Sequence, residues 1–244
     1  MGDGVRAYWE ESRSHRYSLL FALPLLLLYE LLEAVAPVRL SGGVVRNGAD
    51  VILTSLFTAL FGPRGPMVFM ALVIGGALVL IWRDRRAGPI RPGYFPLMTL
   101  ESCALALLFG VVVGTATVHL LGPLRSLAAG AGGVRGSPLE LLTLSLGAGL
   151  YEELLFRVVL VALLSNAMRL AGFNRLTSGV VAVILGALIF SAFHYIGPFG
   201  EPLRLESFVF RALAGVAFSA LYLTRGFGIT AWTHALYDVV VLIL

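Results

Sequence analysis

The chain has 244 residues, a mass of 26.1 kDa, a formal net charge of +4 and a mean hydropathy of +0.90. Hydrophobic residues make up 58% of it and charged residues only 13%, about half the charged share of an ordinary soluble domain. This composition excludes an ordinary soluble domain and, with so many aromatic and aliphatic residues, intrinsic disorder. The single cysteine, Cys103, excludes an internal disulfide and a Cys-rich metal site. We therefore expect a membrane protein whose main surroundings are lipid.

The positive charge comes entirely from arginine, since the chain contains no lysine. In a membrane protein such charge is better explained by loops at the lipid surface than by nucleic-acid binding, so we expect no nucleic-acid partner. An Ala-x-Ala pattern at residues 34–36 has the form of a signal-peptide cleavage site, but Glu30 and Glu33 interrupt the apolar stretch before it. We therefore keep this stretch as the first helix of a multi-pass protein, which we expect in the bacterial plasma membrane.

Eight apolar segments follow a polar start at residues 1–16. A bilayer crossing takes about 20 apolar residues, and backbone exposed to lipid must satisfy its own hydrogen bonds. The pattern thus predicts an all-α transmembrane bundle in one membrane-embedded domain, residues 1–244. Segment 48–61 is short, so seven crossings plus one re-entrant or short segment is the alternative, and this choice alters the orientation that the arginine-rich loops favour. The segments are 17–36, 48–61, 67–82, 97–121, 139–168, 176–196, 206–223 and 227–244.

Ionisable residues lie deep inside these segments, where each costs about 2.5 to 3.5 kcal/mol on insertion scales and needs a partner or a function. In the fifth segment, Glu153 and Arg157 are four residues apart, in the favourable order for an ion pair on one helix face. Glu152 is rotated by about 100° from Glu153, so Arg157 cannot serve both carboxylates equally. An unpaired carboxylate suits a general base that takes a proton from water. The structural alternative is a hydrogen bond to a neighbouring helix.

Two histidines lie in later segments. His194 stands near the end of the sixth segment, and His234 lies one helical turn before Asp238 in the eighth, on the same face. If each segment crosses once, the start of the fifth and the ends of the sixth and eighth lie on one side of the membrane. Depths counted at about 1.5 Å per residue scatter, but they are compatible with a single site that includes Glu152.

Three motifs thus follow one another, each within its own apolar segment: Glu152-Glu153-x-x-x-Arg157, Phe190-x-x-x-His194 and His234-x-x-x-Asp238. Together they resemble the CAAX prenyl endopeptidase and bacteriocin-processing family of intramembrane proteases, also called the CPBP or Abi family. The resemblance covers residues 149–244, and eight apolar segments are similar to the fold of that family. It implies a glutamate-dependent peptidase, a hydrolase that acts on a membrane-associated protein or peptide substrate.

The resemblance also implies a role for each motif residue. Glu152 is expected to activate the water and His194 to help hold it. His234, together with Asp238, is expected to stabilise the oxyanion of the tetrahedral intermediate. The second glutamate and the arginine of the first motif are expected to brace their helix as structural support.

Several alternatives stay open at this point. Many relatives have Asn in place of Asp238, and because an ionised Asp can only accept hydrogen bonds, Asp238 is either protonated or keeps His234 cationic. Glu152, His194 and His234 could form a zinc site with an open position, although His-Glu-x-x-His is absent and we expect no cofactor. A noncatalytic relative that acts as a membrane scaffold or immunity protein would keep the same packing. A proton-coupled transporter would also use buried Glu, His and Asp, and no oligomeric state is predicted.

Overall fold

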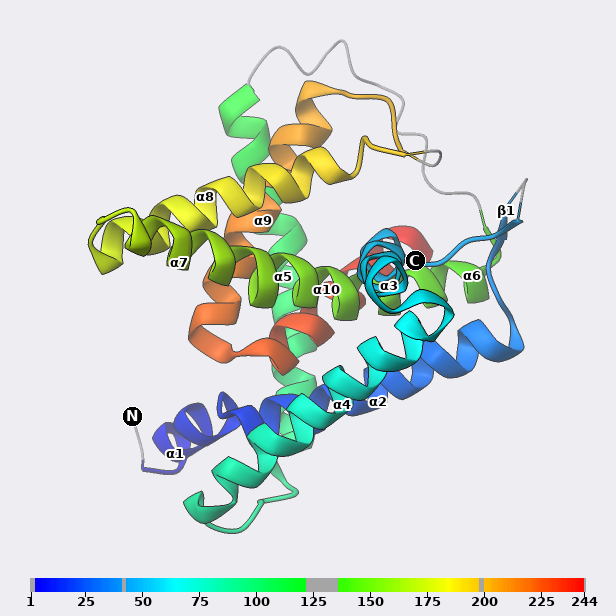
Figure 1. The fold of residues 1–244 in the computed structure, drawn as a ribbon. Helices are drawn as coiled ribbons and strands as arrows, with labels where there is room; N and C mark the ends of the chain where they lie inside the picture. Colours follow the sequence, from blue (N-terminus) through cyan, green and yellow to red (C-terminus); the bar gives the residue numbers. More distant parts are fainter. Residues whose placement is uncertain (1–2, 41–42, 122–135, 198–199, 244) are drawn as a thin grey trace.

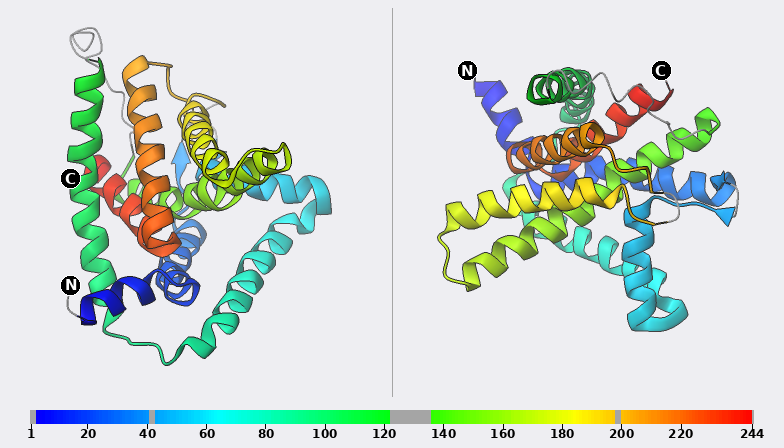
Figure 2. Two further views of the ribbon diagram at one scale, coloured as in Figure 1. Left: turned by 90° about the vertical axis from the view of Figure 1, so that its left-hand side faces the viewer. Right: turned by 90° about the horizontal axis from the view of Figure 1, so that it is seen from above.

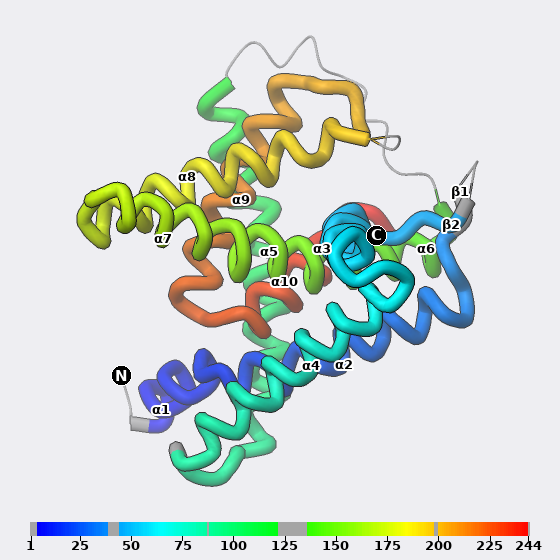
Figure 3. The backbone as a smooth tube through the Cα atoms, viewed as in Figure 1, coloured from blue at the N-terminus to red at the C-terminus, as the bar shows by residue number. Residues whose placement is uncertain are grey.

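The structure is a computed structural model that describes residues 3–40, 43–121, 136–197 and 200–243. Apart from a two-stranded antiparallel pair, β1 (Arg39–Leu40) and β2 (Gly43–Val44), the regular elements in these ranges are helices (Figures 1 and 3). The α-helices are α1 (Asp3–Ser12), α2 (His15–Val35), α3 (Gly48–Phe61), α4 (Gly65–Asp84), α5 (Tyr94–Leu121), α6 (Pro138–Gly147), α7 (Ala162–Leu170), α8 (Arg175–Phe193), α9 (Leu205–Arg225) and α10 (Phe227–Ile243). Two π-helical stretches, Ala148–Glu152 and Leu154–Val161, join α6 to α7, and short 3-10 helices cover Gly62–Arg64 and Arg85–Ala87.

The predicted all-α class is confirmed, and each apolar segment corresponds to helical structure with closely similar bounds. Leu244, the last residue of the eighth segment, lies outside the described residues. Five helical units are long and apolar enough to cross a membrane: α2, Gly48–Asp84 (α3 with α4), α5, α8 and α9. The helix α10 is apolar but shorter. The protein is therefore a multi-pass membrane protein.

The helices do not run parallel to one another. In Figure 1, α5 and α9 stand upright, while the α6–α7 unit and α8 run across them. In the left view of Figure 2, α10 crosses α5 next to α9, and it packs against α2, α5, α6, α9 and the 148–152 stretch. Because α10 packs against all of these elements, its side chains have fixed positions relative to each of them.

Small residues and one buried ion pair hold α10 in this place. Gly226 has φ +79° and lets the chain turn sharply from α9 into α10, a conformation that residues with a Cβ rarely adopt. A Cβ on Gly228 would lie only 2.4 Å from the Ser18 carbonyl oxygen of α2. Beside this turn, the buried Arg225 pairs with Glu101 of α5, with 2.5 Å between Nε and Oε1. The end of α9 is thereby tied to α5.

Large apolar side chains lie on the outside as well as in the core. Leu100, Leu107 and Val111 of α5 are each more than 60% exposed. In water such continuous apolar surface would favour association, whereas in a bilayer it faces the acyl chains. The interior, by contrast, contains Tyr29, Leu25 and Tyr151 packed together, next to the polar groups described below.

Candidate active site

The helix that leads into the first motif has wider turns than an α-helix, and neighbouring elements pack closely against it. Residues Ala148–Glu152 form π-helical turns, which occur often at functional sites. A Cβ on Gly149 would lie 2.4 Å from the Ala231 carbonyl oxygen, and one on Gly147 would lie 2.9 Å from the Cβ of Asn47. The two glycines thus allow α10 on one side, and the residues just before α3 on the other, to approach the glutamates directly.

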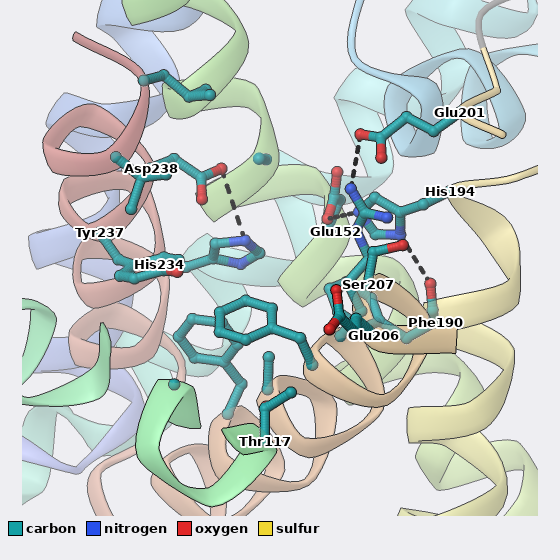
Figure 4. A pocket seen from close by; sticks show the side chains of 18 of the residues that line it. Thr117, Glu152, Phe190, His194, Glu201, Glu206, Ser207, His234, Tyr237 and Asp238 are labelled. Carbon is teal, nitrogen blue, oxygen red and sulfur yellow. Dashed lines mark hydrogen bonds and ion pairs between the residues drawn. The ribbon is translucent and has the colours of Figure 1, made fainter. Parts of the chain in front are cut away.

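A cavity of about 530 Å³ lies beside this helix, between α5, α8, α9 and α10. All four residues predicted to be catalytic line it: Glu152, His194, His234 and Asp238. In Figure 4, Glu152 and His194 face each other on one side of the cavity, and His234 and Asp238 lie on the other. The three motifs, which are far apart in sequence, therefore come together at one site.

Glu152 and His194 approach each other without touching. The distance from Glu152 Oε2 to His194 Nε2 is 3.9 Å, which is too long for a direct hydrogen bond. A water molecule that lies to one side of the line between these atoms can bond to both. Water often bridges polar groups that are more than about 3.5 Å apart. The side chain of Glu152 is 8% exposed and that of His194 is 24% exposed, so the site is mostly shielded but reachable from the cavity.

The ring of His194 is held in one orientation. Its Nδ1 lies 2.9 Å from the carbonyl oxygen of Phe190, one turn earlier in α8. Since a carbonyl only accepts, Nδ1 carries the hydrogen and Nε2 of the neutral ring has a free lone pair. The carbonyl of His194 accepts a hydrogen bond from the Glu201 amide at 3.0 Å, which fixes the backbone just beyond the helix end. His194 can therefore accept a hydrogen bond from a water bound by Glu152.

Glu153 and Arg157 form the ion pair that their spacing predicted. Arg157 Nε lies 3.2 Å from Glu153 Oε2, and both side chains are almost fully buried. The guanidinium also lies over the ring of Phe190, with 4.4 Å from Cζ to the ring centroid, and near that of Phe218 at 5.5 Å. These rings supply a cation–π environment that offsets part of the cost of burying the charge.

Glu153 makes a second contact that the sequence did not predict. Its Oε1 lies 2.7 Å from Nδ1 of His234. Because a carboxylate only accepts, Nδ1 carries the hydrogen and Nε2 of His234 is the nitrogen that faces the cavity. The imidazole is also stacked on Phe218, with ring centroids 4.3 Å apart. His234 is thus oriented by Glu153 as well as by its own helix.

Asp238 lies on the other side of His234. Its Oδ2 is 3.8 Å from His234 Nε2, so the predicted pair is in contact range but is not joined by a direct hydrogen bond. Both groups line the cavity. A substrate oxygen placed between them would face one nitrogen and one carboxyl group.

Asn47, just before α3, is a site residue that the sequence did not reveal. Its amide Nδ2 donates to Glu152 Oε1 at 2.9 Å, and its Oδ1 accepts from the backbone N–H of Ala49. An Asn directly before segment 48–61 is a typical helix N-cap, so the bond to Ala49 could have been predicted. Nothing in the spacing of residues 47 and 152 predicts the bond to Glu152, because that bond depends on how distant parts of the chain pack together.

A polar cluster lies behind Asn47. Asp50 accepts from Tyr29 at 2.9 Å and from Arg46 at 2.5 Å, and Arg46 also bonds Glu30. Although burial lowers the pKa of Arg46, the neighbouring Tyr29, Asp50 and Glu30 raise it overall, so the guanidinium remains charged. Glu30 also accepts from Tyr151, the residue before Glu152. The helix α2, for which the sequence indicated no role in the site, is thus connected to the first motif.

The cavity has a charged edge formed by α9 and the residues after α8. Arg211 donates to Glu201 Oε1 at 2.6 Å and to the Tyr195 hydroxyl at 3.1 Å. Tyr195 is also within 2.6 Å of Ser207. These contacts close the segment that follows His194 onto α9.

Zinc is the metal that Glu152, His194 and His234 would hold if they formed a three-ligand site with an open position. Among the described residues, no three His, Cys, Asp or Glu side chains are grouped in a way that could hold a metal ion. The arrangement of the described residues does not fit a three-ligand zinc site.

The fold and the site define a multi-pass membrane protein with a shielded carboxylate–histidine centre inside its helical bundle. Residues 135–240 match the family model described as Type II CAAX prenyl endopeptidase Rce1-like. The chain is similar to that family over these residues, which are a little under half of its length and contain all three motifs. Comparison of the chain with curated proteins and with solved structures found no match.

Proposed function

We propose that this protein is an intramembrane endopeptidase in which Glu152 activates a water molecule to hydrolyse a peptide bond. The single observation that best supports this is the 3.9 Å separation of Glu152 Oε2 and His194 Nε2, next to a cavity of about 530 Å³. A volume of this order accommodates a short stretch of extended peptide. The family match over residues 135–240 independently supports a protease.

In the first step, Glu152 takes a proton from the water while His194 Nε2 accepts the hydrogen bond of its other hydrogen. The resulting hydroxide oxygen attacks the carbonyl carbon of the substrate, and the carbonyl electron pair moves to oxygen. The low exposure of both groups favours this step, since it keeps bulk water from displacing the bound water molecule.

In the intermediate, the negatively charged oxygen needs hydrogen-bond donors in place before the reaction. His234 is suited to this in its cationic form, in which Nδ1–H donates to Glu153 and Nε2–H is free to donate to the oxyanion. The nearby Asp238 balances the positive charge of the ring and can donate only when protonated. Pre-positioned donors of this kind are among the largest contributions to acyl-transfer catalysis.

In the last step, the carbon–nitrogen bond breaks and the proton held by Glu152 passes to the departing amine. This transfer returns Glu152 to its ionised form, and the new carboxylic acid then releases its own proton, so that the products are a carboxylate and an amine. All atoms of the products come from the substrate and one water molecule.

We further propose that residues 1–244 act as a single domain. The reason is that groups outside the matched segment take part in the site: Asn47 bonds Glu152, and α10 packs on α2. The substrate would be a protein or peptide held at the membrane, because the site opens within a bundle surrounded by lipid.

The proposal is tested by comparing membranes of cells that contain the wild-type protein or Glu152→Ala. Proteomic analysis of chain ends should find new termini on membrane-associated proteins only with the wild type. Identical sets of termini at equal protein levels would reject proteolysis and favour the noncatalytic scaffold.

A further inference from the structure

The side chain of Asn47 performs two separate tasks at one place. Its oxygen caps α3 by accepting the Ala49 N–H at 2.9 Å, and its nitrogen donates to Glu152 Oε1, also at 2.9 Å. Asn47 is 7% exposed and lines the cavity. It lies outside the segment 135–240 that matches the protease family.

The geometry divides the two oxygens of Glu152 between two partners. Oε1 is bound to Asn47 at 2.9 Å, while Oε2 faces His194 at 3.9 Å. A carboxylate anchored through one oxygen cannot rotate freely about its last bond. The anchored Oε1 therefore keeps the lone pairs of Oε2 directed at the position of the water.

Asn47 is itself held firmly. Its oxygen is fixed by the first turn of α3, and its backbone N–H points at the Tyr29 hydroxyl, 3.4 Å away. Tyr29 in turn donates to Asp50. On the opposite side, Gly147 leaves room for Asn47, because a Cβ there would come within 2.9 Å of it. The amide is consequently pre-oriented before any substrate binds.

From these contacts we infer that Asn47 is a positioning residue for the general base, and that the amino-terminal half contributes directly to catalysis through it. The inference rests on the proposed role of Glu152. Asn47 should affect the rate of the chemical step and not the affinity for substrate, because it bonds a carboxylate of the enzyme and not the substrate. Misplacement of a reacting group by about 1 Å can cost about 100-fold in rate.

The two tasks of Asn47 can be separated by substitution. Asp and Ser are both good N-caps, but neither presents an amide N–H to Glu152. Asn47→Ser and Asn47→Asp should therefore fold with a melting temperature close to that of the wild type, whereas Asn47→Ala loses the cap as well. If the cap were the only role, the first two variants would be fully active and only the alanine variant would be impaired.

A matched control is available in the same chain. Asn174 caps α8 by accepting the Thr177 N–H at 2.9 Å, and it is exposed and not among the residues that line the cavity. Asn174→Ser and Asn174→Asp make the same chemical changes at a cap that bonds no catalytic group. They should leave kcat unchanged.

The experiment measures kcat, KM and thermal unfolding of the full-length protein in detergent or liposomes, with a fluorogenic form of a substrate found by the terminus analysis. The expected result is a fall in kcat of about 10- to 100-fold for Asn47→Ser, with KM little changed. Asn47→Asp should show a similar loss of kcat. If the added charge prevents this variant from folding, the kcat of Asn47→Ser is the test of the inference. A kcat for folded Asn47→Ser within about threefold of the wild type, or a loss equal to that of Asn174→Ser, would overturn the inference.

Glu152→Gln, measured in the same series, separates this inference from the proposed function. If Glu152→Gln is inactive and Asn47→Ser is fully active, only the role of Asn47 is rejected. If Glu152→Gln is as active as the wild type, the proposed function fails, and the positioning role fails with it.

Discussion

Glu153 and His234, which are 81 residues apart in the chain, are joined by a buried hydrogen bond of 2.7 Å between Oε1 and Nδ1. The other oxygen of Glu153 faces Arg157 at 3.2 Å. A group that was expected only to brace its own helix thus also orients the imidazole that faces the cavity. Glu152 and Glu153 are adjacent, yet they serve the two sides of the cavity.

The two contacts of Glu153, with His234 and with Arg157, lead to a prediction about the buried ion pair. Arg157→Ala should lower the free energy of unfolding by about 3 to 5 kcal/mol, because it leaves Glu153 charged and unpaired. The double variant Glu153→Leu with Arg157→Met replaces both charges by apolar groups and should recover most of that stability. Thermal or denaturant unfolding in detergent measures both.

Activity should not recover with stability in the double variant, because His234 no longer has a partner at Nδ1. We expect a loss of about 100-fold or more in kcat, the size found when an oxyanion donor is removed. A stable double variant with the kcat of the wild type would show that Glu153 has only a structural role.

A second prediction concerns Asp238, which is 3.8 Å from His234 Nε2. Since Glu153 already orients the imidazole, Asp238→Asn should keep at least about a tenth of the wild-type kcat, as the amide can donate to an oxyanion from nearly the same position. Steady-state kinetics of this variant beside Glu153→Gln checks the assignment. A larger loss for Asp238→Asn than for Glu153→Gln would mean that Asp238, not Glu153, controls His234.

A third prediction concerns the close packing of α10 on the first motif. Gly149→Ala would place a Cβ 2.4 Å from the Ala231 carbonyl oxygen, so α10 must shift. Overpacking of this kind costs about 1 to 3 kcal/mol, and the shift should also weaken the Glu153–His234 bond. We expect a lower melting temperature together with reduced kcat.

Gly75→Ala is the matched control, because a Cβ on this glycine of α4 meets nothing within 4 Å. In a helix, replacing Gly by Ala without a clash is neutral or stabilising. Wild-type stability and activity for Gly149→Ala would contradict the close approach of the two helices.

The sequence predicted a large part of this architecture and less of the site. The apolar segments were long enough to define the helices, and the spacing of Glu153 and Arg157 predicted their ion pair correctly. The depth estimate, by contrast, scattered because it assumed straight parallel crossings, whereas the α6–α7 unit runs across α5 and α9 (Figure 1). The hydrogen bonds from Asn47 to Glu152 and from His234 to Glu153 connect distant segments, and no local periodicity records such contacts.

A fourth prediction concerns metal ions. If Glu152 activates the water without a metal, purified protein should keep its kcat after dialysis against a chelator, and added zinc should not increase it. Metal analysis of the active preparation accompanies the assay. Loss of activity on chelation, with recovery on return of about one zinc per chain, would favour the zinc mechanism instead.

The most direct test of the account is hydrolysis in water enriched in heavy oxygen, with wild-type protein and Glu152→Gln compared in liposomes. Mass spectrometry of the product should show a water-derived oxygen in the new terminal carboxylate with the wild type. Glu152→Gln, which is isosteric and should unfold at nearly the same temperature, should give no product above background. Formation of the same labelled product by folded Glu152→Gln at the wild-type rate would contradict the central claim that this carboxylate activates the water.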